Sequence, residues 1–538
     1  MKLCRNLILL YLLLIISISV VNAQYLLKDS LSYELRYFVK LLEETHPDPY
    51  TEFGGKVKFH KEIFDLEQKI ETDNITLKEY TALLSSLLSG LHDGHSYLNS
   101  DSKTESSGKY IPISLRVISD GLLIEKISFQ YKEYLGARLT AINNISIDSL
   151  CVLISRIIPC ENKYSRYNAL KMMTHNPSHI YRLFPDLKDH ISLTVLTQDD
   201  EEKKFNLELS ENKISDIQER VEYPKWKKEP LGDYLYFDYL DNEGKTMYMK
   251  VGSIMSRECF LYMKENNWTG FENMLTNLYK RILYKELPDD RDKAIDDIPS
   301  FSEIFKSMLC EMSENKSENL IIDLRKNGGG FTDITLPSLY MLYGDKYLNT
   351  DMNNVFYRLI SPLLMEKYGT TLSKYNESNN SNYRFGNYTF FTKKKEEKTI
   401  QQKRDIFVSN AMGGAGVFIK DLNGQPVYTP KHVYVLTDVQ TFSAAFHYAF
   451  YLWKMGAIIV GVPSSQAPNT YMEVTPFELP YTKVKGSISN SVQYFLPVAD
   501  KRAKIFWPDM MPEYKDYKKY NFDQDTELLW LLDRINNK

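Results

Sequence analysis

The sequence is poor in the residues that identify disulfide-stabilised, nucleic-acid-binding or metal-binding proteins. Its five cysteines are too few to form a disulfide framework in 538 residues, and none follows the spacing of a zinc site. The 66 lysines and arginines nearly balance the 70 aspartates and glutamates, so the net charge is −4. There is no basic excess for nucleic acid and no acidic tail. We expect no metal, no cofactor and no nucleic-acid partner.

Long apolar runs are also scarce, apart from one at the N-terminus. Two basic residues precede the run at 7–21, and small residues follow it. Residues 1–23 therefore have the pattern of a secretory signal peptide, and we expect a periplasmic or extracellular protein with no later transmembrane segment. An uncleaved membrane anchor is the alternative, because the run is nearly long enough to span a bilayer. In an oxidising compartment Cys151 and Cys160 can form a disulfide bridge.

Residues 24–104 are predicted to form a small helical cap. Three segments place apolar residues three and four positions apart, which is the helical period. The first two segments are separated by THPDPY at 45–50, where two prolines favour an extended turn that exposes His46. A rigid connector between helices explains this turn as well as a functional role does.

The third helix of the cap is followed directly by LHDGHSYL at 91–98. Glycines interrupt the helix here, so His92, Asp93 and His95 are expected on a turn. Turn histidines are commonly solvated or capping groups. Two histidines and an aspartate also suggest a metal, but no further ligand cluster follows at a suitable spacing.

Residues 105–215 return to short β-like runs. The piece GARLTAINNISIDSL predicts a strand, an Asn-Asn turn, a second strand and the start of a helix. It resembles the corresponding piece of a PDZ domain, which binds an extended peptide at a sheet edge. An unrelated small β domain is the alternative.

Residues 230–538 are predicted to form an α/β core. Within it, an apolar run at 433–436, a polar turn, a long apolar helix and a second run at 457–462 make a βαβ pattern. Ser443 falls where the first strand passes into the helix, beside backbone N–H groups that have no helical acceptor. A nucleophile that stabilises an oxyanion needs this position. The alternative is that Thr441 or Ser443 caps the helix.

A glycine-rich loop follows another buried strand of this core, in ENLIIDLRKNGGG at 318–330. A P-loop would continue with a lysine and a serine or threonine, whereas Phe331 and Thr332 follow here. The loop is therefore expected to bring backbone N–H groups close to a ligand. Residues 346–404 are polar and asparagine-rich, and we expect an insertion near the site that forms a hairpin with mobile flanks. Residues 524–535 predict a last amphipathic helix.

Three motifs, DGHSYL, LIIDLRKNGGG and VLTDVQTFSAAFHYAF…GAIIVGV, occur in the order and approximate spacing found in the tail-specific, or C-terminal-processing, serine peptidases. The sequence resembles that family over most of the chain that follows the predicted signal peptide. The resemblance implies an α+β multidomain fold with a helical cap, a PDZ-like module and an α/β core of the Clp peptidase and crotonase type.

The same resemblance implies roles for individual residues. Ser443 matches the nucleophile, and the glycine-rich loop matches the one that supplies an oxyanion-binding N–H, from Gly329 or its neighbour Gly330. The Ala444 N–H is the second donor. The family commonly has a glutamate three residues after the nucleophile, where this chain has Phe446.

The general base of the better-known branch is missing. There a lysine follows the serine by about two dozen residues, but the matching turn here is VPSSQAPN, with Ala467 or Pro468 at the lysine position. A serine without a base is a poor nucleophile. The branch that resembles the tricorn core uses a histidine of the cap region, and His95 stands at its place.

An acidic residue completes the site in that branch. Asp500, ahead of the closing Pro508-Asp509, is the candidate, and Glu473 or Asp93 are alternatives.

We therefore expect an exported serine endopeptidase that acts on peptides or proteins. A catalytically silent relative that binds peptides or apolar ligands is the alternative, favoured by the missing lysine and by Phe446. A solute-binding or surface-glycan protein is a third interpretation, based only on export and on the 39 tyrosines.

Overall fold

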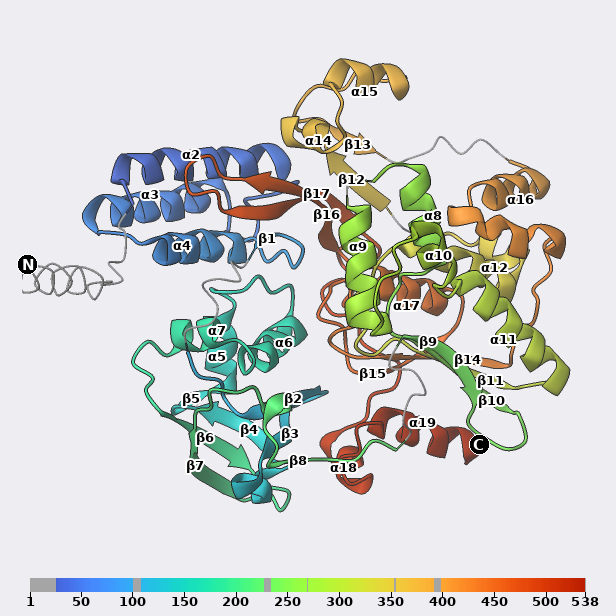
Figure 1. Cartoon of the computed structure of the whole chain (residues 1–538), viewed down its shortest axis with the longest axis horizontal. Coiled ribbons are helices and arrows are strands. Elements are labelled where there is room, and N and C mark those ends of the chain that lie inside the picture. Colours follow the sequence, from blue (N-terminus) through green and yellow to red (C-terminus); the bar gives the residue numbers. More distant parts are fainter. Residues whose placement is uncertain are drawn as a thin grey trace, which may run out of the picture.

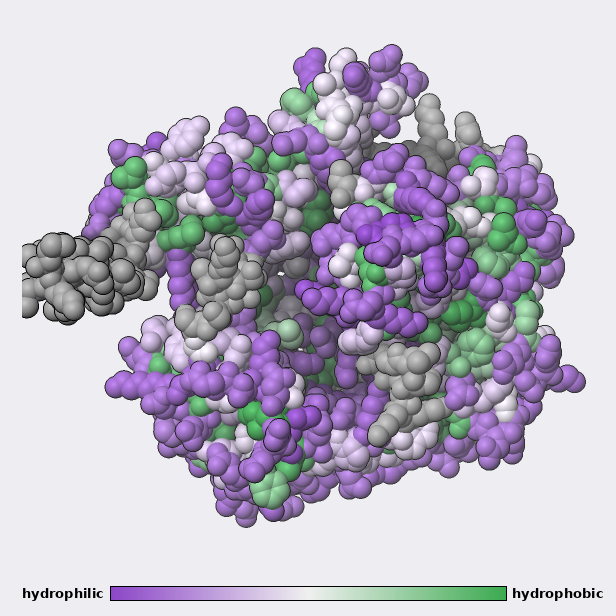
Figure 2. Space-filling view, in the orientation of Figure 1, coloured by the Kyte–Doolittle hydropathy of each residue, from purple (hydrophilic) through white to green (hydrophobic). Residues whose placement is uncertain are grey.

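The computed structural model describes residues 26–99, 108–226, 234–268, 270–352, 355–390 and 398–537. The predicted signal peptide lies outside these ranges. The described part of the chain has a mixed α+β, multidomain architecture with three sheets, and Figure 1 shows the N-terminal helices above a β region, with a larger α/β core beside both. Figure 2 shows that the surface is hollowed where these three parts meet. None of the described helices has the length and apolar character needed to cross a membrane.

The N-terminal helices pack as a layer with one buried face. They are α2 (Lys28–Thr45), α3 (Lys56–Thr72) and α4 (Leu77–Ser89), and the two-residue strand β1 (Tyr97–Leu98) follows them. Thr76 and Glu79 form a capping box that starts α4. Leu35, Phe38 and Leu84 belong to the apolar cluster between the helices.

The β region is a seven-stranded antiparallel sheet with helices on it. Its strands are β2 (Ile113–Ile118), β3 (Gly121–Ser128), β4 (Arg138–Ile142), β5 (Ile145–Ser146), β6 (His190–Leu196), β7 (Glu202–Glu208) and β8 (Arg220–Glu222). Its helices are η1 (Phe129–Tyr134), α5 (Ile147–Ile154), α6 (Lys163–Met173), α7 (Pro177–Leu183) and η2 (Ile214–Asp216). The predicted Asn-Asn turn joins β4 and β5, with Asn143 and Asn144 both at positive φ. Cys151 and Cys160 are free thiols, so the bridge allowed by the sequence is not formed. The PDZ-like interpretation stays a prediction.

The core sheet has the order β15-β14-β11-β10-β9 and is parallel except at β9. Its strands are β9 (Leu235–Tyr239), β10 (Thr246–Val251), β11 (Asn319–Asp323), β14 (His432–Thr437) and β15 (Ile458–Gly461). The predicted βαβ unit is confirmed: β14 leads into α17 (Ala444–Lys454), which returns to β15 beside it. Every residue from Ala444 to Leu452 is buried, as expected for a helix that is apolar on all sides.

Further helices surround the core sheet. They are α8 (Arg257–Glu265), α9 (Phe271–Leu278), η3 (Tyr279–Leu283), α10 (Arg291–Asp296), α11 (Phe301–Asn315), η4 (Thr332–Thr335), α12 (Leu336–Tyr343), α13 (Asp345–Asn349), α16 (Ile400–Ser409), η5 (Met412–Phe418), η6 (Lys420–Leu422), α18 (Tyr514–Lys519) and α19 (Thr526–Asn536). The last of these is the predicted C-terminal amphipathic helix, and its apolar face covers the sheet through Leu528 and Leu531.

A third sheet connects the core to the N-terminal helices. It contains β1, β12 (Val355–Leu359), β13 (Tyr388–Phe390), β16 (Thr470–Glu478) and β17 (Lys485–Tyr494). The β16–β17 hairpin extends from the core along α2 in Figure 1, and β17 pairs with β1. Much of the predicted insertion is part of this sheet. Its residues form β12, α14 (Pro362–Lys367), α15 (Leu372–Ser378) and β13, so they are not simply a polar loop.

The tip of the hairpin is fastened to α2 by a buried carboxylate. Glu34 accepts hydrogen bonds from the N–H groups of Tyr481 (2.5 Å) and Thr482 (2.8 Å) and from the Thr482 hydroxyl (2.7 Å). Apolar side chains of the hairpin, Phe477 and Ile488 among them, join the cluster of the N-terminal helices. These contacts hold the turn after α4 next to the core.

Candidate active site

Ser443 stands on a strained turn between β14 and α17. Its φ of 55° and ψ of −125° lie in a region that non-glycine residues rarely adopt, and its side chain makes no capping hydrogen bond. This is the backbone geometry of a nucleophile elbow, in which a sharp strand-to-helix turn presents a hydroxyl at the N-terminus of a helix.

Thr441 does not cap the helix either. Its hydroxyl donates to the Leu324 carbonyl (2.9 Å) and accepts from the Asp438 N–H (3.0 Å), so it fastens the turn to the end of β11. The alternative of an ordinary N-cap at Thr441 or Ser443 is therefore wrong.

The glycine-rich loop packs directly against this elbow. A Cβ atom at Gly329 would lie 2.8 Å from the Ser443 Cβ and 2.9 Å from the Ala444 nitrogen, so only glycine can occupy the position. Gly330 passes equally close to Ile254, whose carbonyl oxygen would lie 1.9 Å from an added Cβ. Gly329 therefore packs against Ser443 and Ala444, as the resemblance implied, and Gly330 follows it in the same loop.

Asn327 fixes the orientation of the glycine-rich loop and binds the Gly329 N–H that was expected to bind an oxyanion. Its side chain donates to the Val251 carbonyl (2.7 Å) and accepts from the Gly329 N–H (2.9 Å), and its own carbonyl accepts from the Phe442 N–H (3.0 Å). The Gly329 N–H is therefore engaged and not free to bind an oxyanion in this conformation. Ala444 is the first residue of α17, so its N–H has no acceptor within the helix.

The His95 ring contacts Phe442, the residue before Ser443 on the elbow. The two rings stack with their centroids 4.8 Å apart. Both ring nitrogens are buried and have no well-aligned hydrogen bond among the described residues, so no hydrogen bond joins His95 to Ser443. Burial lowers the pKa of His95, while the nearby charge of Asp93 and the Tyr471 carbonyl act in the opposite direction.

Asp93 is the carboxylate that acts on His95. It accepts a hydrogen bond from the His95 backbone N–H (2.9 Å) and another from the Ser96 hydroxyl, and the His46 Nε2 lies 3.4 Å from its Oδ2. Burial alone would raise its pKa, but His46, His95 and Ser96 together lower the pKa of Asp93 to about 2. Asp93 is therefore ionised throughout the physiological range.

The other two acidic candidates have different partners. Asp500 lies in a turn where it accepts hydrogen bonds from the backbone and side chain of Arg502. Glu473 pairs with Arg358 at an irregular position of β16. The structure therefore supports Asp93, more than Asp500 or Glu473, as the partner of His95.

His92 has a different partner from His95, since its Nδ1 lies 3.2 Å from a Glu52 oxygen. In the described ranges, no group of three or more His, Cys, Asp or Glu side chains is arranged to hold a metal.

Two buried groups at this site were missed from the sequence. Gln466 is fully buried in the turn that replaces the family's lysine, and its Oε1 accepts the Ser443 N–H at 2.5 Å. Its Nε2 is a buried donor with no acceptor in the described part of the chain. The position of Gln466 next to the expected lysine was the available signal.

Glu161 is the second group, and nothing in its local sequence marks it. Its carboxyl group accepts hydrogen bonds from the N–H of Gly94 (3.2 Å) and of Ala467 (2.7 Å), so it joins the histidine turn to the glutamine turn. Burial, with a smaller contribution from Asp93, raises the pKa of Glu161 to about 8. The carboxyl group is therefore mostly neutral at pH 7.

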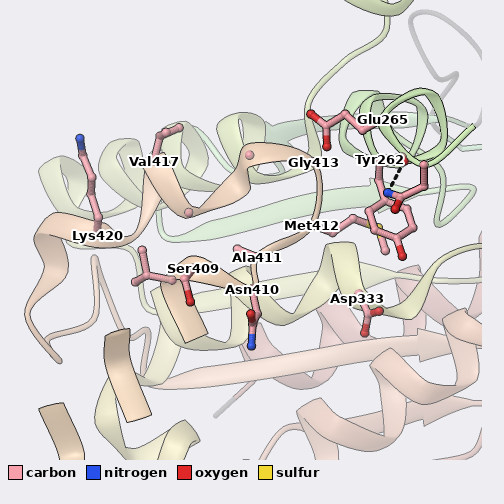
Figure 3. Close-up of a pocket in the computed structure, with 14 residues that line it drawn as sticks. Tyr262, Glu265, Asp333, Ser409, Asn410, Ala411, Met412, Gly413, Val417 and Lys420 are labelled. Atoms are coloured by element: carbon pink, nitrogen blue, oxygen red, sulfur yellow. Dashed lines mark hydrogen bonds between the residues drawn. The ribbon is translucent and has the colours of Figure 1, made fainter. Parts of the chain in front are cut away.

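A cavity of about 660 Å³ lies between α8, η4 and η5 (Figure 3). Asp333 of η4 forms one wall, and the glycines of η5 form another. Burial raises the pKa of Asp333. On the side of α17, the Thr332 hydroxyl and the His447 Nδ1 are 2.9 Å apart, and burial lowers the pKa of His447 to about 3. His447 is therefore a neutral structural group.

Comparisons with known proteins agree with this arrangement. Residues 295–489, which include the glycine-rich loop and Ser443, match the model of peptidase family S41. None of the curated proteins matches the chain. Among solved structures, mature CPAF is similar over 95% of this chain and 98% of its own, with 15% identity and a TM-score of 0.58. Mature CPAF complexed with lactacystin covers 95% and 99%, with 15% identity and a TM-score of 0.55.

At this identity the structural similarity establishes the fold, and the family match supports the chemistry. The matched region contains the serine elbow and the glycine loop, which are the parts that a serine-type peptidase requires. Residues 295–489 are similar to peptidase family S41, the tail-specific serine peptidases, and this match supports a serine-type peptidase.

Proposed function

We propose that the protein is an exported serine endopeptidase in which Ser443 is the nucleophile and His95 the general base. The observation that carries this proposal is the strained backbone of Ser443 at the start of α17, packed against Gly329. A strained residue persists only where the surrounding structure fixes it, and such residues cluster at functional sites.

In the proposed reaction the Ser443 Oγ attacks the carbonyl carbon of a peptide, and its proton passes to a ring nitrogen of His95. His95 then donates this proton to the leaving amine, and water attacks the acyl-enzyme in a second step. The charge of Asp93 favours the imidazolium that forms. The Ala444 N–H, with an N–H of Gly329 or Gly330, faces the developing oxyanion.

The reaction requires two adjustments of the structure described here. The His95 ring has to turn from its stacked position to the Ser443 hydroxyl, and an oxyanion donor from Gly329 requires its N–H to leave Asn327. Catalytic hydrogen bonds are often long or absent without substrate and form in the Michaelis complex. The burial of the His95 ring nitrogens, which have no well-aligned hydrogen bond among the described residues, supports this role.

A fluorophosphonate probe tests the proposal directly. It should label wild-type protein at Ser443, and Ser443→Ala should abolish the labelling. Ser409→Ala, on the outer helix α16, is the control variant. Asp438→Asn would not serve as a control, because the Asp438 carboxylate accepts hydrogen bonds that hold the turn before Ser443. Absence of labelling in folded wild-type protein would favour the catalytically silent relative.

Export and the role of the β region belong to the same proposal. We infer that residues 1–23 direct secretion, which N-terminal sequencing of the exported protein checks by finding Gln24 first. The PDZ-like interpretation of residues 105–215 predicts that a peptide binds there by strand addition.

A further inference from the structure

A second cavity, of about 790 Å³, lies between the turn after α2 and the strands β12, β13, β16 and β17. Aromatic rings form most of its walls: Tyr50, Tyr357, Phe385, Tyr388, Tyr471 and Tyr494. Phe385, Tyr388 and Tyr494 are each more than a third exposed, so the rings face accessible space. The Tyr388 hydroxyl donates to the Pro47 carbonyl, which joins the two sides of the cavity.

A carboxylate stands among these rings. Asp48 accepts hydrogen bonds at one oxygen, Oδ1, from the N–H groups of Tyr50 and Thr51, both at 3.1 Å, which fixes its direction between two prolines. Burial raises the pKa values of Tyr50, Tyr388, Tyr471 and Tyr494, and the charge of Asp48 raises each of them further. The four phenol groups therefore lie around one anionic centre.

The charge of Asp48 has no cationic partner in the part of the chain that the structure describes. The other carboxylates of the cavity do have partners: Glu43 lies 3.0 Å from the His60 Nε2, and Glu44 lies 3.8 Å from the Lys40 Nζ. No lysine or arginine is among the described residues that line the cavity, and the Lys56 Nζ lies 5.2 Å from the centre of the Tyr50 ring. An unpaired carboxylate with the faces of several aromatic rings is the environment that binds an organic cation, by ion pairing and by cation–π contact.

The cavity is adjacent to the catalytic residues of the proposed function. His46 and Tyr471 form its inner wall, with ring centroids 4.3 Å apart. Behind them, the His46 Nε2 lies 3.4 Å from Asp93, and the Tyr471 carbonyl faces the His95 ring. The inner wall of the cavity is therefore formed by residues that contact Asp93 and His95.

We propose that this cavity binds the side chain of a lysine or arginine in the peptide substrate, with Asp48 as the counter-ion. The inference rests on the proposed function, because it assigns a substrate class to the same site. The cation lies against the tyrosine rings, and its aliphatic stem crosses the apolar rim formed by Leu359 and Pro362.

The test uses full-length Ser443→Ala protein, which binds without cleaving. The probes are six hexapeptides of alanine, each with a single arginine at a different one of the six positions. Six matched peptides carry citrulline in place of arginine, because citrulline has nearly the same shape but no charge. Isothermal titration calorimetry should give at least tenfold tighter binding for the best arginine peptide than for its citrulline counterpart. Added salt should reduce this difference.

Asp48→Asn is the decisive variant, because asparagine keeps the Oδ1 acceptor of the turn and removes the charge. It should abolish the preference for arginine, whereas Asp65→Asn, an exposed charge on α3, should retain it. A melting curve verifies that both variants fold. Equal affinity for arginine and citrulline peptides, or an unchanged preference in Asp48→Asn, would overturn the proposal.

The two proposals fail separately. Labelling of Ser443 by the fluorophosphonate without an arginine preference would leave the peptidase and remove the cation site. An arginine preference without labelling would leave the cation site on a silent relative.

Discussion

At the residue scale, the proposed nucleophile Ser443 and the proposed base His95 are not joined by a hydrogen bond in the present conformation. His95 stacks on Phe442, and its ring nitrogens have no hydrogen bond among the described residues. Ser443→Ala and His95→Ala should each lower kcat by about 10³-fold or more, and the double variant should be scarcely worse. Cleavage of a fluorogenic peptide measures this. Full activity in His95→Ala would identify a different base.

The pH dependence of activity follows from the burial of His95. Only the neutral ring accepts the serine proton, and burial lowers its pKa. Activity should therefore rise with pH through a midpoint below the ordinary imidazole value of 6.5 and be level by pH 7. A profile of kcat/KM against pH gives the midpoint in the free enzyme. A midpoint well above 7 would contradict the assignment.

Gln466 is expected to position the nucleophile. Its Oε1 holds the Ser443 N–H, and its Nε2 is a buried donor with no acceptor in the described chain. Gln466→Ala should lower kcat and the rate of fluorophosphonate labelling by about tenfold or more, with little change in KM, because the elbow loses a contact made by its backbone. Gln466→Glu keeps the acceptor and should restore part of the labelling rate.

Gln440→Ala is the control for Gln466, since Gln440 lies on the same turn but bonds to Lys171. If Gln466→Ala labels and turns over like wild type, the glutamine is only a packing residue.

At the scale of elements, Glu161 joins two turns that come from distant parts of the chain. The pKa of this carboxyl is raised from 4.5 to about 8 in the folded protein. As pH rises from 4.5 to 8, the unfolded chain releases this proton while the folded chain keeps it. The free energy of unfolding should therefore fall across this window, by at most about 5 kcal/mol.

Glu161→Gln cannot ionise and should lack this loss of stability. Urea unfolding at a series of pH values compares it with Glu62→Gln, an exposed position on α3 that should behave like wild type. Parallel curves for wild type and Glu161→Gln between pH 5 and 8 would show that Glu161 ionises normally.

Local patterns in the sequence predicted the elements that carry the chemistry. The strand, turn and helix around Ser443 and the glycine-rich loop are encoded by neighbouring residues, and both elements were predicted from them. The contact between the two was implied only by the family resemblance, and the structure shows it. Non-local pairings were not predictable in this way. Nothing in the sequence of β16 and β17 states that their hairpin lies on α2. Asp93, one of the sequence alternatives, acts on His95 from two residues away along the chain.

At the scale of the whole molecule, a buried network of charges joins the C-terminal helix α19, the β region and the core sheet. Glu527 of α19 accepts hydrogen bonds from Arg116 of β2 (2.5 Å) and from Arg325 after β11 (3.0 Å). Arg325 also pairs with Asp323 (2.7 Å), which the Tyr248 hydroxyl contacts. The C-terminal helix thereby connects the β region to the core sheet, close to the glycine-rich loop.

Glu527→Gln should destabilise the protein by about 3–5 kcal/mol, because it leaves two buried guanidinium groups with less compensating charge. The two arginines, acting against burial, lower the pKa of Glu527. Its contribution is therefore present above the unfolded value of about 4.5 and is lost as pH falls through the lower folded value. Urea unfolding at pH 7 and at pH 3 should show a large difference between wild type and variant at pH 7 and a smaller one at pH 3.

The exposed Glu314→Gln on α11 is the matched control and should unfold like wild type. Because the network spans the β region and the core, Glu527→Gln should also separate their unfolding, so that fluorescence and limited proteolysis report two transitions where wild type has one. A single transition at the wild-type midpoint would mean that the apolar contact of α19 with the core sheet, not its charge, joins the two parts.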